Sequence, residues 1–227
     1  MIENNSIILG DCLEVMKQIP LDNIDLILTD PPYNVGYHYK AKDDNRTLEE
    51  YQEFFKPMIG KPTVIIHYPE NIISDIVPIL GNPEKCVSWV YNSNLPRQHR
   101  MIAWFNCKPD FSKAKQPYKN LEDKRIKENG SSDGARLYDW WEIQQVKNIS
   151  SDKLNHPCMI PLLVKKRIIQ ITTNEGDTIL DPFAGSGTTA IACHDLKRNF
   201  ICIEKEPEYH AIACKRYAEA KAQMQLF

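Results

Sequence analysis

The stretch TILDPFAGSGTT, at residues 178–189, decides the fold. Its first three residues are β-branched or apolar and predict a buried strand, and Gly185 and Gly187 predict a tight loop that opens a helix near Thr188. Such a loop brings bare backbone to the carboxyl end of a strand, where ligands bind in open parallel sheets. Only nine of the 227 residues are glycine, about 4 % against a usual 7 %, so two in one loop need a reason.

The pattern of this loop disfavours two common cofactors. It lacks the third glycine of a dinucleotide-binding fingerprint and the Gly-Lys-Ser/Thr of a phosphate-binding loop. Nicotinamide cofactors and nucleoside triphosphates are therefore not expected. On these residues alone, a site for another cofactor and a plain strand-to-helix turn both stay open.

Short apolar runs alternate with amphipathic stretches over most of the chain, which predicts an α/β fold. The expected strands are residues 6–9, 24–28, 63–66, 87–91, 101–105, 178–180 and 200–203. The expected helices are residues 48–58, 161–172, 188–196 and 208–223. Residues 108–155 break the alternation because they are polar, rich in lysine and carry a GSSDG turn cluster. The chain is thus expected to form one domain over residues 1–227, with an insertion at residues 108–155.

A second stretch joins a predicted strand to a stiff loop, since DLILT at residues 25–29 runs into DPPYN at residues 30–34. Pro31 and Pro32 fix their own φ angles and remove two backbone donors, so the loop offers acceptors. These are the Asp30 carboxylate and the carbonyls of Asp30 and Pro31, beside the flat ring of Tyr33. Two acceptors and a ring suit a planar aromatic amine. The alternative is a rigid loop with a capping aspartate and a core tyrosine.

Charge is unevenly distributed along the chain. The net charge is −2, yet residues 95–136 hold ten Lys or Arg against five Asp or Glu, a local +5. This asymmetry indicates either a polyanion contacted by one region or a solvated insertion. The candidate cations are Lys113, Lys115 and Lys119, expected on a loop, and Lys124, Arg125 and Lys127, expected on a short helix. Trp140 and Trp141, further along the insertion, are expected in the core rather than stacked on a base.

Composition excludes several classes of protein. With 42 % apolar and 26 % charged residues, the chain can bury a core, which excludes disorder. No apolar run approaches the roughly 18 residues that span a bilayer, and the first ten residues do not resemble a signal peptide. We therefore expect a cytoplasmic protein with no membrane partner. The seven cysteines are scattered, and no two are separated by only two residues, so neither a metal site nor a disulfide framework is expected.

The two motifs and their flanks together resemble an amino-group DNA methyltransferase that depends on S-adenosylmethionine. The arrangement is the one in which the DPPY motif precedes the FxGxG motif, and the resemblance covers nearly the whole chain. It rests on residues 10–12 and 25–34 in the N-terminal half, and on residues 155–157, 176–189 and 200–204 in the C-terminal half. It implies a Rossmann-like α/β fold with a doubly wound, mostly parallel sheet of seven strands. Strand 6–9 would lie beside strand 200–203 and the C-terminal helix would connect them, in effect a circular permutation of the usual order.

The resemblance also assigns roles to residues. If the strands at 24–28 and 178–180 are neighbours, the loops after them converge, so cofactor and target base face each other. Asp30 and the Pro31 carbonyl would accept hydrogen bonds from the 6-amino group of adenine, and Tyr33 would stack on the flipped base. The catalytic loop is then Asp30, Pro31, Pro32 and Tyr33. The cofactor would be bound by Asp11, Cys12, His156, Asp181, Phe183, Ala184, Gly185, Ser186, Gly187, Thr188 and Glu204.

Some of these roles have structural alternatives. His156 precedes Pro157 and could simply end a loop, Glu204 could belong to a solvated charge run, and Cys12 could be a small buried residue. The chain also departs from the family pattern at Ile160-Pro161, where many relatives have Lys-Pro. One cofactor contact of the family is therefore not expected here.

The implied function is transfer of a methyl group from S-adenosylmethionine to the 6-amino group of adenine in DNA. Asp rather than Ser at position 30 favours adenine by resemblance. Methylation of cytosine at N4, a catalytically silent DNA-binding partner of the same fold, and transfer to RNA or to a protein glutamine stay open. The insertion lies where relatives carry target recognition, so DNA is the expected partner. A cognate restriction endonuclease is a compatible partner, and the sequence leaves both it and the oligomeric state open.

Overall fold

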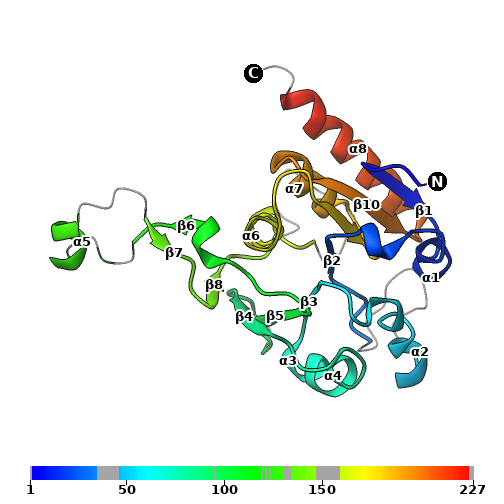
Figure 1. Cartoon of the computed structure of the whole chain (residues 1–227), viewed down its shortest axis with the longest axis horizontal. Helices are drawn as coiled ribbons and strands as arrows, with labels where there is room; N and C mark the ends of the chain where they lie inside the picture. The colour runs from blue at the N-terminus through cyan, green and yellow to red at the C-terminus, as the bar shows by residue number, and fades with distance from the viewer. Residues whose placement is uncertain are drawn as a thin grey trace.

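The computed structural model describes residues 2–34, 46–94, 96–118, 120, 122, 124–129, 134–146 and 159–224. Their main sheet has the strand order β1-β10-β9-β2-β3-β5-β4-β8 (Figure 1). The parallel strands are β1 (Ser6–Leu9), β10 (Asn199–Glu204), β9 (Thr178–Asp181), β2 (Leu26–Thr29) and β3 (Thr63–His67). They are followed by β5 (His99–Phe105), which is antiparallel to both β3 and β4 (Lys85–Val90). The expected Rossmann-like α/β fold with a doubly wound, mostly parallel sheet is confirmed.

The described part of the sheet has one strand more than the seven expected. The additional strand, β8 (Trp140–Glu142), pairs parallel with β4 and comes from the expected insertion. Three residues are too short to show a strand periodicity, so the sequence pattern could not predict it. The two tryptophans of β8 point to opposite faces: Trp141 is 1 % exposed and belongs to the core, whereas Trp140 is 40 % exposed. The core expectation is thus right for Trp141 and wrong for Trp140.

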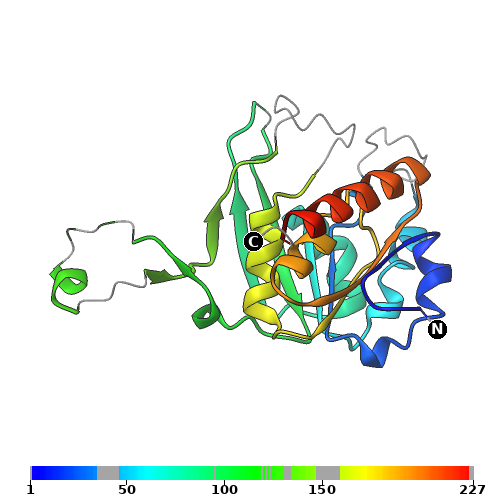
Figure 2. The ribbon, with the colours of Figure 1, turned by 90° about the horizontal axis from the view of Figure 1, so that it is seen from above.

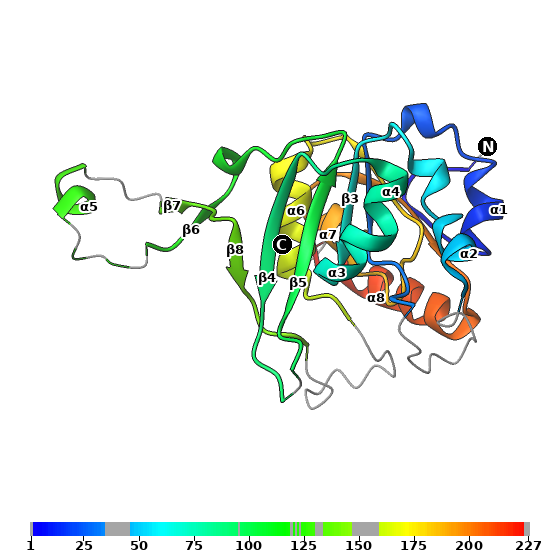
Figure 3. The same cartoon turned by 90° about the horizontal axis from the view of Figure 1, so that it is seen from below.

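Helices cover both faces of the sheet (Figure 1 and Figure 3). One hydrophobic cluster packs α6 (Leu162–Thr172) and α7 (Thr188–Asp195) on one face, and α8 (Pro207–Met224) lies against α7 and β1. A second cluster covers the opposite face with α1 (Cys12–Met16), η1 (Leu21–Asn23), α2 (Leu48–Gln52), η3 (Ile72–Ile76) and α4 (Val77–Leu80). The short helix α3 (Pro69–Asn71) precedes η3 and contacts it. The predicted pairing of β1 with β10 is confirmed, and the C-terminal helix α8 packs on both strands.

The helix expected at residues 48–58 is shorter in the structure. It ends at Gln52, and only the 3₁₀ turn η2 (Lys56–Met58) follows. Pro57 cannot donate the backbone hydrogen bond that a continuing helix would need. Phe54 and Phe55 between the two pieces are buried in the core.

The chain changes direction across the sheet between β9 and β2. Their parallel register pairs Leu26 with Ile179 and Ile27 with Leu180, so the two strands predicted to be neighbours are neighbours. From β9 the chain proceeds through α7, β10 and α8 toward one edge, whereas β2 leads to β3 and the other edge. The loops after β9 and β2 therefore open at the switch point of the sheet, where ligands bind in such folds.

After β5, the turn η4 (Phe111–Lys113) packs against α6, and the chain then leaves the main body of the protein. The part that leaves contains the strands β6 (Lys115–Gln116) and β7 (Ala135–Arg136), which form an antiparallel pair, and α5 (Lys124–Asn129). Figure 1 and Figure 2 show β6, β7 and α5 projecting away from the sheet, with α5 farthest from it. Among the described residues, no helix is long and apolar enough to cross a membrane.

Candidate functional site

Three carboxylates lie along the carboxyl edge of neighbouring strands. The register pairs Cys202 with Asp181, and Ile27 with Leu180. Because residues two apart in a strand share a face, Glu204 of β10 and Asp30 after β2 project from the same face as Asp181. The two sequence motifs and the acidic residue of a third strand are thus brought together, as the sequence predicted for the two loops.

A cavity opens at this edge and is lined by both predicted loops. Of the predicted site residues, those on its wall are Asp11, Cys12, Asp30, Pro31, Pro32, Asp181, Phe183, Ala184, Gly185, Ser186, Thr188 and Glu204. The wall also includes residues that the sequence did not single out, among them Arg46, Phe54, Lys165 and Tyr209. Tyr33 and Gly187 are not on the wall, and His156 lies outside the described residues.

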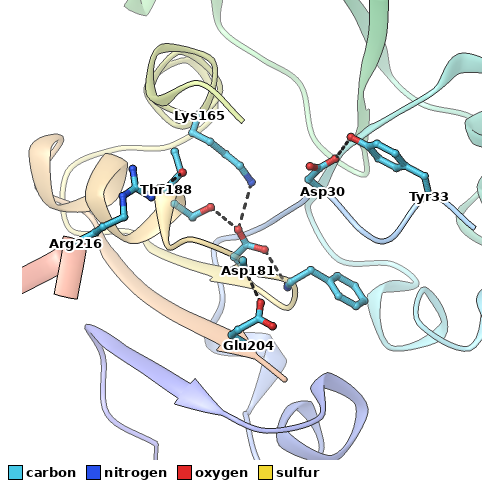
Figure 4. A network of polar contacts seen from close by, with 10 residues as sticks. Asp30, Tyr33, Lys165, Asp181, Thr188, Glu204 and Arg216 are labelled. Atoms are coloured by element: carbon cyan, nitrogen blue, oxygen red, sulfur yellow. Dashed lines mark hydrogen bonds and ion pairs between the residues drawn. The ribbon is translucent and has the colours of Figure 1, made fainter. Parts of the chain in front are cut away.

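Asp181 is the most heavily engaged of the three carboxylates. Its Oδ1 accepts a hydrogen bond from the backbone N–H of Phe183 at 3.1 Å, and its Oδ2 accepts one from the Thr189 hydroxyl. The ammonium group of Lys165, on α6, lies 3.3 Å from the same Oδ2 (Figure 4). Both side chains of this ion pair are at most 4 % exposed. Asp181 therefore holds the start of the glycine loop and, through Lys165, joins it to α6.

Glu204 holds the middle of the glycine loop. Its carboxylate accepts hydrogen bonds from the backbone N–H of Gly185 at 2.7 Å and of Glu206 at 2.9 Å. Burial raises the pKa of Glu204, and the N–H groups of Glu206 and Gly185 partly oppose this rise because they favour the charged form. Each carboxylate oxygen keeps a further lone pair that can accept a hydrogen bond from a hydroxyl on the cavity side.

The second glycine of the loop serves helix packing. Gly187 has φ +78°, and a Cβ atom there would lie 2.8 Å from the Cβ and 3.0 Å from the Cα of Ala213 on α8. Its missing side chain thus lets α8 approach the loop. Arg216, also on α8, donates hydrogen bonds to the Ser186 carbonyl and, at 3.0 Å, to the Ser186 hydroxyl. The structure shows Gly187 packed against Ala213 of α8, whereas its predicted contact with the cofactor stays a prediction.

In the DPPY loop, the Asp30 carboxylate lines the cavity, but the Tyr33 ring does not. Asp30 is half-buried and lines the cavity, whereas Tyr33 is only 4 % exposed, is not on the cavity wall, and directs its hydroxyl toward Asp30 (Figure 4). The Tyr33 hydroxyl donates a hydrogen bond to Asp30 Oδ1 at 2.5 Å. Its ring lies 4.7 Å from the His67 ring and 4.8 Å from the Tyr68 ring, centroid to centroid. The predicted stacking of Tyr33 on a base stays a prediction, and it would require the ring to turn out of this packing.

The N-terminal contribution to the wall comes from the first turn of α1. Asp11 caps this helix by accepting a hydrogen bond from the Leu13 N–H at 3.0 Å, and Lys205 lies 3.6 Å from its other oxygen. Cys12 is 5 % exposed, and burial, followed by the nearby Asp11 charge, raises the pKa of its thiol to about 12. The thiol is therefore neutral at physiological pH, which fits a small buried residue on the cavity wall.

The predicted DNA-binding lysines do not form one cluster. The Lys113 ammonium group donates hydrogen bonds to the Thr173 carbonyl at 3.2 Å and to Asn174 Oδ1 at 2.8 Å. Both acceptors lie between α6 and the start of β9, at the edge of the sheet opposite to Asp181. Lys115 on β6 and Lys124 and Lys127 on α5 are exposed, and α5 is a short helix as expected. Lys119 lies outside the described residues, as does the side chain of Arg125.

Two buried cations at or next to the site were missed by the sequence motifs. Lys165 lies on the apolar face of α6, three and four residues before the buried Ile168 and Ile169. Arg100, 4 % exposed, shares one face of β5 with the buried Ile102 and Trp104. In both cases a charged residue occupies a position that the periodicity assigns to the core. This pattern is the signal that could have found them, because a buried charge requires a partner.

Comparison with known proteins identifies related sequences and folds. A family model described as DNA methylase matches residues 63–215. The chain is 27 % identical to the DNA adenine methyltransferase YhdJ of Escherichia coli, over 94 % of this chain and 83 % of that protein. Among solved structures, the M1.HpyAVI–SAM complex matches with a TM-score of 0.63 and 29 % identity, covering 93 % of this chain and 98 % of that one. The cytosine-N4-specific PvuII DNA methyltransferase shares the fold, with a TM-score of 0.68, 18 % identity and coverage of 97 % and 92 %.

Proposed function

The chain belongs to the DNA methylase family, and from this premise we propose that it methylates the 6-amino group of adenine in DNA. The family membership makes it a DNA methyltransferase of the amino-group type, with S-adenosylmethionine as the methyl donor. The observation that carries the proposal is that Asp30 and the glycine loop open onto one cavity from neighbouring strands. A group held by the Asp30 loop therefore faces a cofactor held by the glycine loop.

The cavity wall suits S-adenosylmethionine chemically. The cofactor carries a positive sulfonium and an α-amino group, which match an edge with three carboxylates. Glu204 can accept hydrogen bonds from the ribose hydroxyls, and Phe54 and Ile160 give apolar walls. The methionine carboxylate needs a cation, and many relatives have a lysine at the position of Ile160. In this chain Lys165, five residues later, supplies a buried ammonium group on the cavity wall. We assign this contact to Lys165.

The Asp30 loop supplies the activation of the amino group. S-adenosylmethionine provides an electrophilic methyl group on a sulfonium sulfur. The lone pair of the 6-amino nitrogen is delocalised into the adenine ring, so the nitrogen is a poor nucleophile. Hydrogen bonds from the NH2 to the Asp30 carboxylate and the Pro31 carbonyl favour its pyramidal form, and they stabilise the positive charge that develops as it attacks the methyl carbon. The C–S bond breaks as the N–C bond forms, and the nitrogen then loses a proton toward Asp30 and solvent.

Adenine is favoured over cytosine for two reasons. By resemblance, an aspartate at the first position of the DPPY loop is typical of adenine methyltransferases. YhdJ, whose name gives adenine as its target, is related over nearly the whole chain, whereas the likeness to the cytosine-N4 enzyme concerns the fold. Methylation of cytosine at N4 remains the alternative, because its 4-amino group would make the same two hydrogen bonds.

The projecting segment is the proposed site of DNA contact. Lys115, Lys124 and Lys127 are exposed on it, and a loop or arm at this place in the chain carries target recognition in the family. We do not include Lys113 among the proposed DNA-binding lysines, because its ammonium group is hydrogen-bonded to Thr173 and Asn174, at the edge of the sheet opposite to Asp181. The described part of the insertion thus has two roles: β8 completes the main sheet, and the segment that carries β6, α5 and β7 is the part proposed to approach DNA.

The function is tested by identifying the methylated base. The full chain is incubated with S-adenosylmethionine carrying a labelled methyl group and with unmethylated DNA, which is then digested to nucleosides for mass spectrometry. We expect labelled N6-methyladenosine in its deoxy form. Labelled N4-methylcytosine would show that cytosine, not adenine, is the target base. Absence of both products, with a protein that still binds the cofactor, would support a catalytically silent member of the family.

A further inference from the structure

Strand β5 inserts a cation into the core next to the DPPY loop. Arg100 is 4 % exposed, pairs with Trp89 of β4 in the sheet, and has a side-chain Nε atom with no hydrogen-bond partner among the described residues. Burying a guanidinium costs several kcal/mol unless an anion or a hydrogen-bond network offsets it. A cation at this position therefore requires a compensating group.

Aromatic rings surround the Arg100 guanidinium. Its central carbon lies 4.7 Å from the ring centroid of Tyr33, 5.4 Å from that of Trp89, 5.8 Å from that of Tyr68 and 5.9 Å from that of Tyr91. These distances are within the range of cation–π attraction. The Tyr33 ring is thus held between Arg100 and the rings of His67 and Tyr68.

Tyr33 links the Arg100 guanidinium to the carboxylate of the DPPY loop. The Tyr33 ring that contacts Arg100 carries the hydroxyl that donates to Asp30 Oδ1 at 2.5 Å. Burial raises the pKa of Asp30; the Arg100 charge is the largest opposing influence, followed by the Tyr33 hydrogen bond and the Lys165 charge, while Asp181 adds to the rise. The charge state of Asp30 therefore depends on a cation of β5, a hydroxyl of its own loop, a cation of α6 and an anion of β9.

We propose that Arg100 is a positioning residue for methyl transfer, which keeps Asp30 ionised and holds Tyr33 against it. This inference rests on the proposed role of Asp30 as the acceptor for the target amino group, and it applies to adenine and cytosine alike. An ionised Asp30 has only acceptors, so one oxygen can accept from the Tyr33 hydroxyl while the carboxylate also accepts from the amino group. Arg100 acts through Asp30 and Tyr33 and does not line the cavity itself.

The test is the pH dependence of single-turnover methyl transfer by Arg100→Met. The rate falls at low pH as Asp30 takes up a proton, so loss of the Arg100 charge moves this acid limb to higher pH, by about one unit or more. Arg100→Lys keeps the charge and is expected to restore most of the wild-type profile. Binding of S-adenosylhomocysteine, measured by calorimetry, is expected to be unchanged in both variants.

Arg198→Met is the matched control for loss of a partly buried arginine. Arg198 donates to the carbonyl and hydroxyl of Thr173 at the opposite edge of the sheet, so its loss should lower stability without moving the acid limb. An Arg100→Met enzyme that is slower but has the wild-type pH profile would overturn the proposal and leave Arg100 a structural role. Should Arg100→Met fail to fold, Arg100→Gln carries the same expectation.

A readout without catalysis separates this inference from the proposed function. The Asp30 carboxyl carbon can be titrated by NMR in the full chain, with its signal assigned from the Asp30→Asn spectrum. Arg100→Gln is expected to raise the Asp30 midpoint relative to wild type even if no DNA base is methylated. An unchanged midpoint would overturn the role of Arg100 regardless of the identity of the substrate.

Discussion

The carboxyl edge of the sheet and the projecting segment at residues 115–136 hold charged groups in opposite ways. At the edge, Asp181, Glu204 and Asp30 each have specified partners, and two of their neighbours are cations at most 4 % exposed. On the projecting segment, the described lysines are exposed, and Lys127 pairs with Glu122 of the same segment.

The difference in burial and pairing of the charges determines the role that each region can have. Charges in a low-dielectric edge interact strongly and have fixed positions, so they can orient a reacting group and set its protonation state. Exposed charges are screened by salt and interact weakly with one another, but they are free to meet phosphates. Substitutions at the edge should therefore change chemistry and stability, and those on the segment should change DNA affinity alone.

The largest expected effect is that of Asp30→Ala on the rate of methyl transfer. We expect single-turnover rates to fall by about 10²-fold or more, because the carboxylate acts on charge that develops in the transition state. Cofactor affinity by calorimetry should stay close to that of wild type. Asp25→Ala is the control at the other end of β2, where Asp25 accepts from the Thr178 N–H at 2.8 Å. It should lower stability and leave the rate near normal; near-normal turnover by Asp30→Ala would refute the mechanism.

The next effect concerns the loop that carries the cofactor site. Gly187→Ala should lower the free energy of unfolding by about 2 kcal/mol more than Gly176→Ala, measured in urea. Both positions have positive φ, so both substitutions carry the cost of a left-handed conformation. A Cβ atom at position 187 would also clash with Ala213, whereas nothing lies within 4 Å of a Cβ atom at position 176. Equal losses would mean that the approach of α8 does not depend on this glycine.

Measured per pH unit, the next effect is smaller: the buried His67 makes the free energy of unfolding depend on pH. Burial lowers the pKa of His67 to about 3, although the Asp75 charge partly opposes this. Below the ordinary pKa of 6.5 the unfolded chain takes up a proton that the folded chain does not. Stability should therefore fall by about 1.4 kcal/mol per pH unit as the pH drops from 6.5 toward 3.

His67→Gln should flatten this dependence in unfolding experiments between pH 7 and pH 4. His99→Gln, at an exposed position on β5, is the matched control and should leave the slope as in wild type. The imidazole accepts from the Tyr68 N–H at 2.7 Å and contacts the Tyr51 hydroxyl at 2.9 Å, which fixes the neutral ring under Tyr33. If His67→Gln keeps the wild-type slope, other groups cause it.

The smallest effect on the folded protein is expected on the projecting segment. Replacing Lys115, Lys124 and Lys127 by Ala should leave unfolding and cofactor binding unchanged. It should reduce the slope of log DNA affinity against log salt by up to about 2.7, since each neutralised phosphate contributes about 0.9. Lys113→Ala is the control, because loss of its two hydrogen bonds should affect stability and leave the salt slope intact. An unaltered slope in the triple variant would place the DNA elsewhere.

The sequence predicted the fold class and the two loops of the site because both rest on local patterns. Each of the seven expected strands overlaps a strand of the main sheet, and the neighbours β2 and β9 bring Asp30 and Asp181 to one cavity. The edge strand β8 was missed because three residues carry no periodicity, and the helix at 48–58 was predicted too long because Pro57 was read as part of it. His156 and Lys119 lie outside the described residues, so their roles stay predictions.

By itself the sequence determined the strand–loop–helix units, their order and the chemical groups that they present, because strand runs, paired prolines and clustered glycines act over a few residues. Only the tertiary structure decided which charges those groups meet. Lys165 reaches Asp181 from a helix 16 residues away along the chain, and Arg100 reaches the Tyr33 ring from β5, two strands across the sheet. Such partners are set by strand order and helix packing, so an isolated motif cannot reveal them. The same packing turned Tyr33 toward Arg100 and drew Lys113 to the far edge of the sheet.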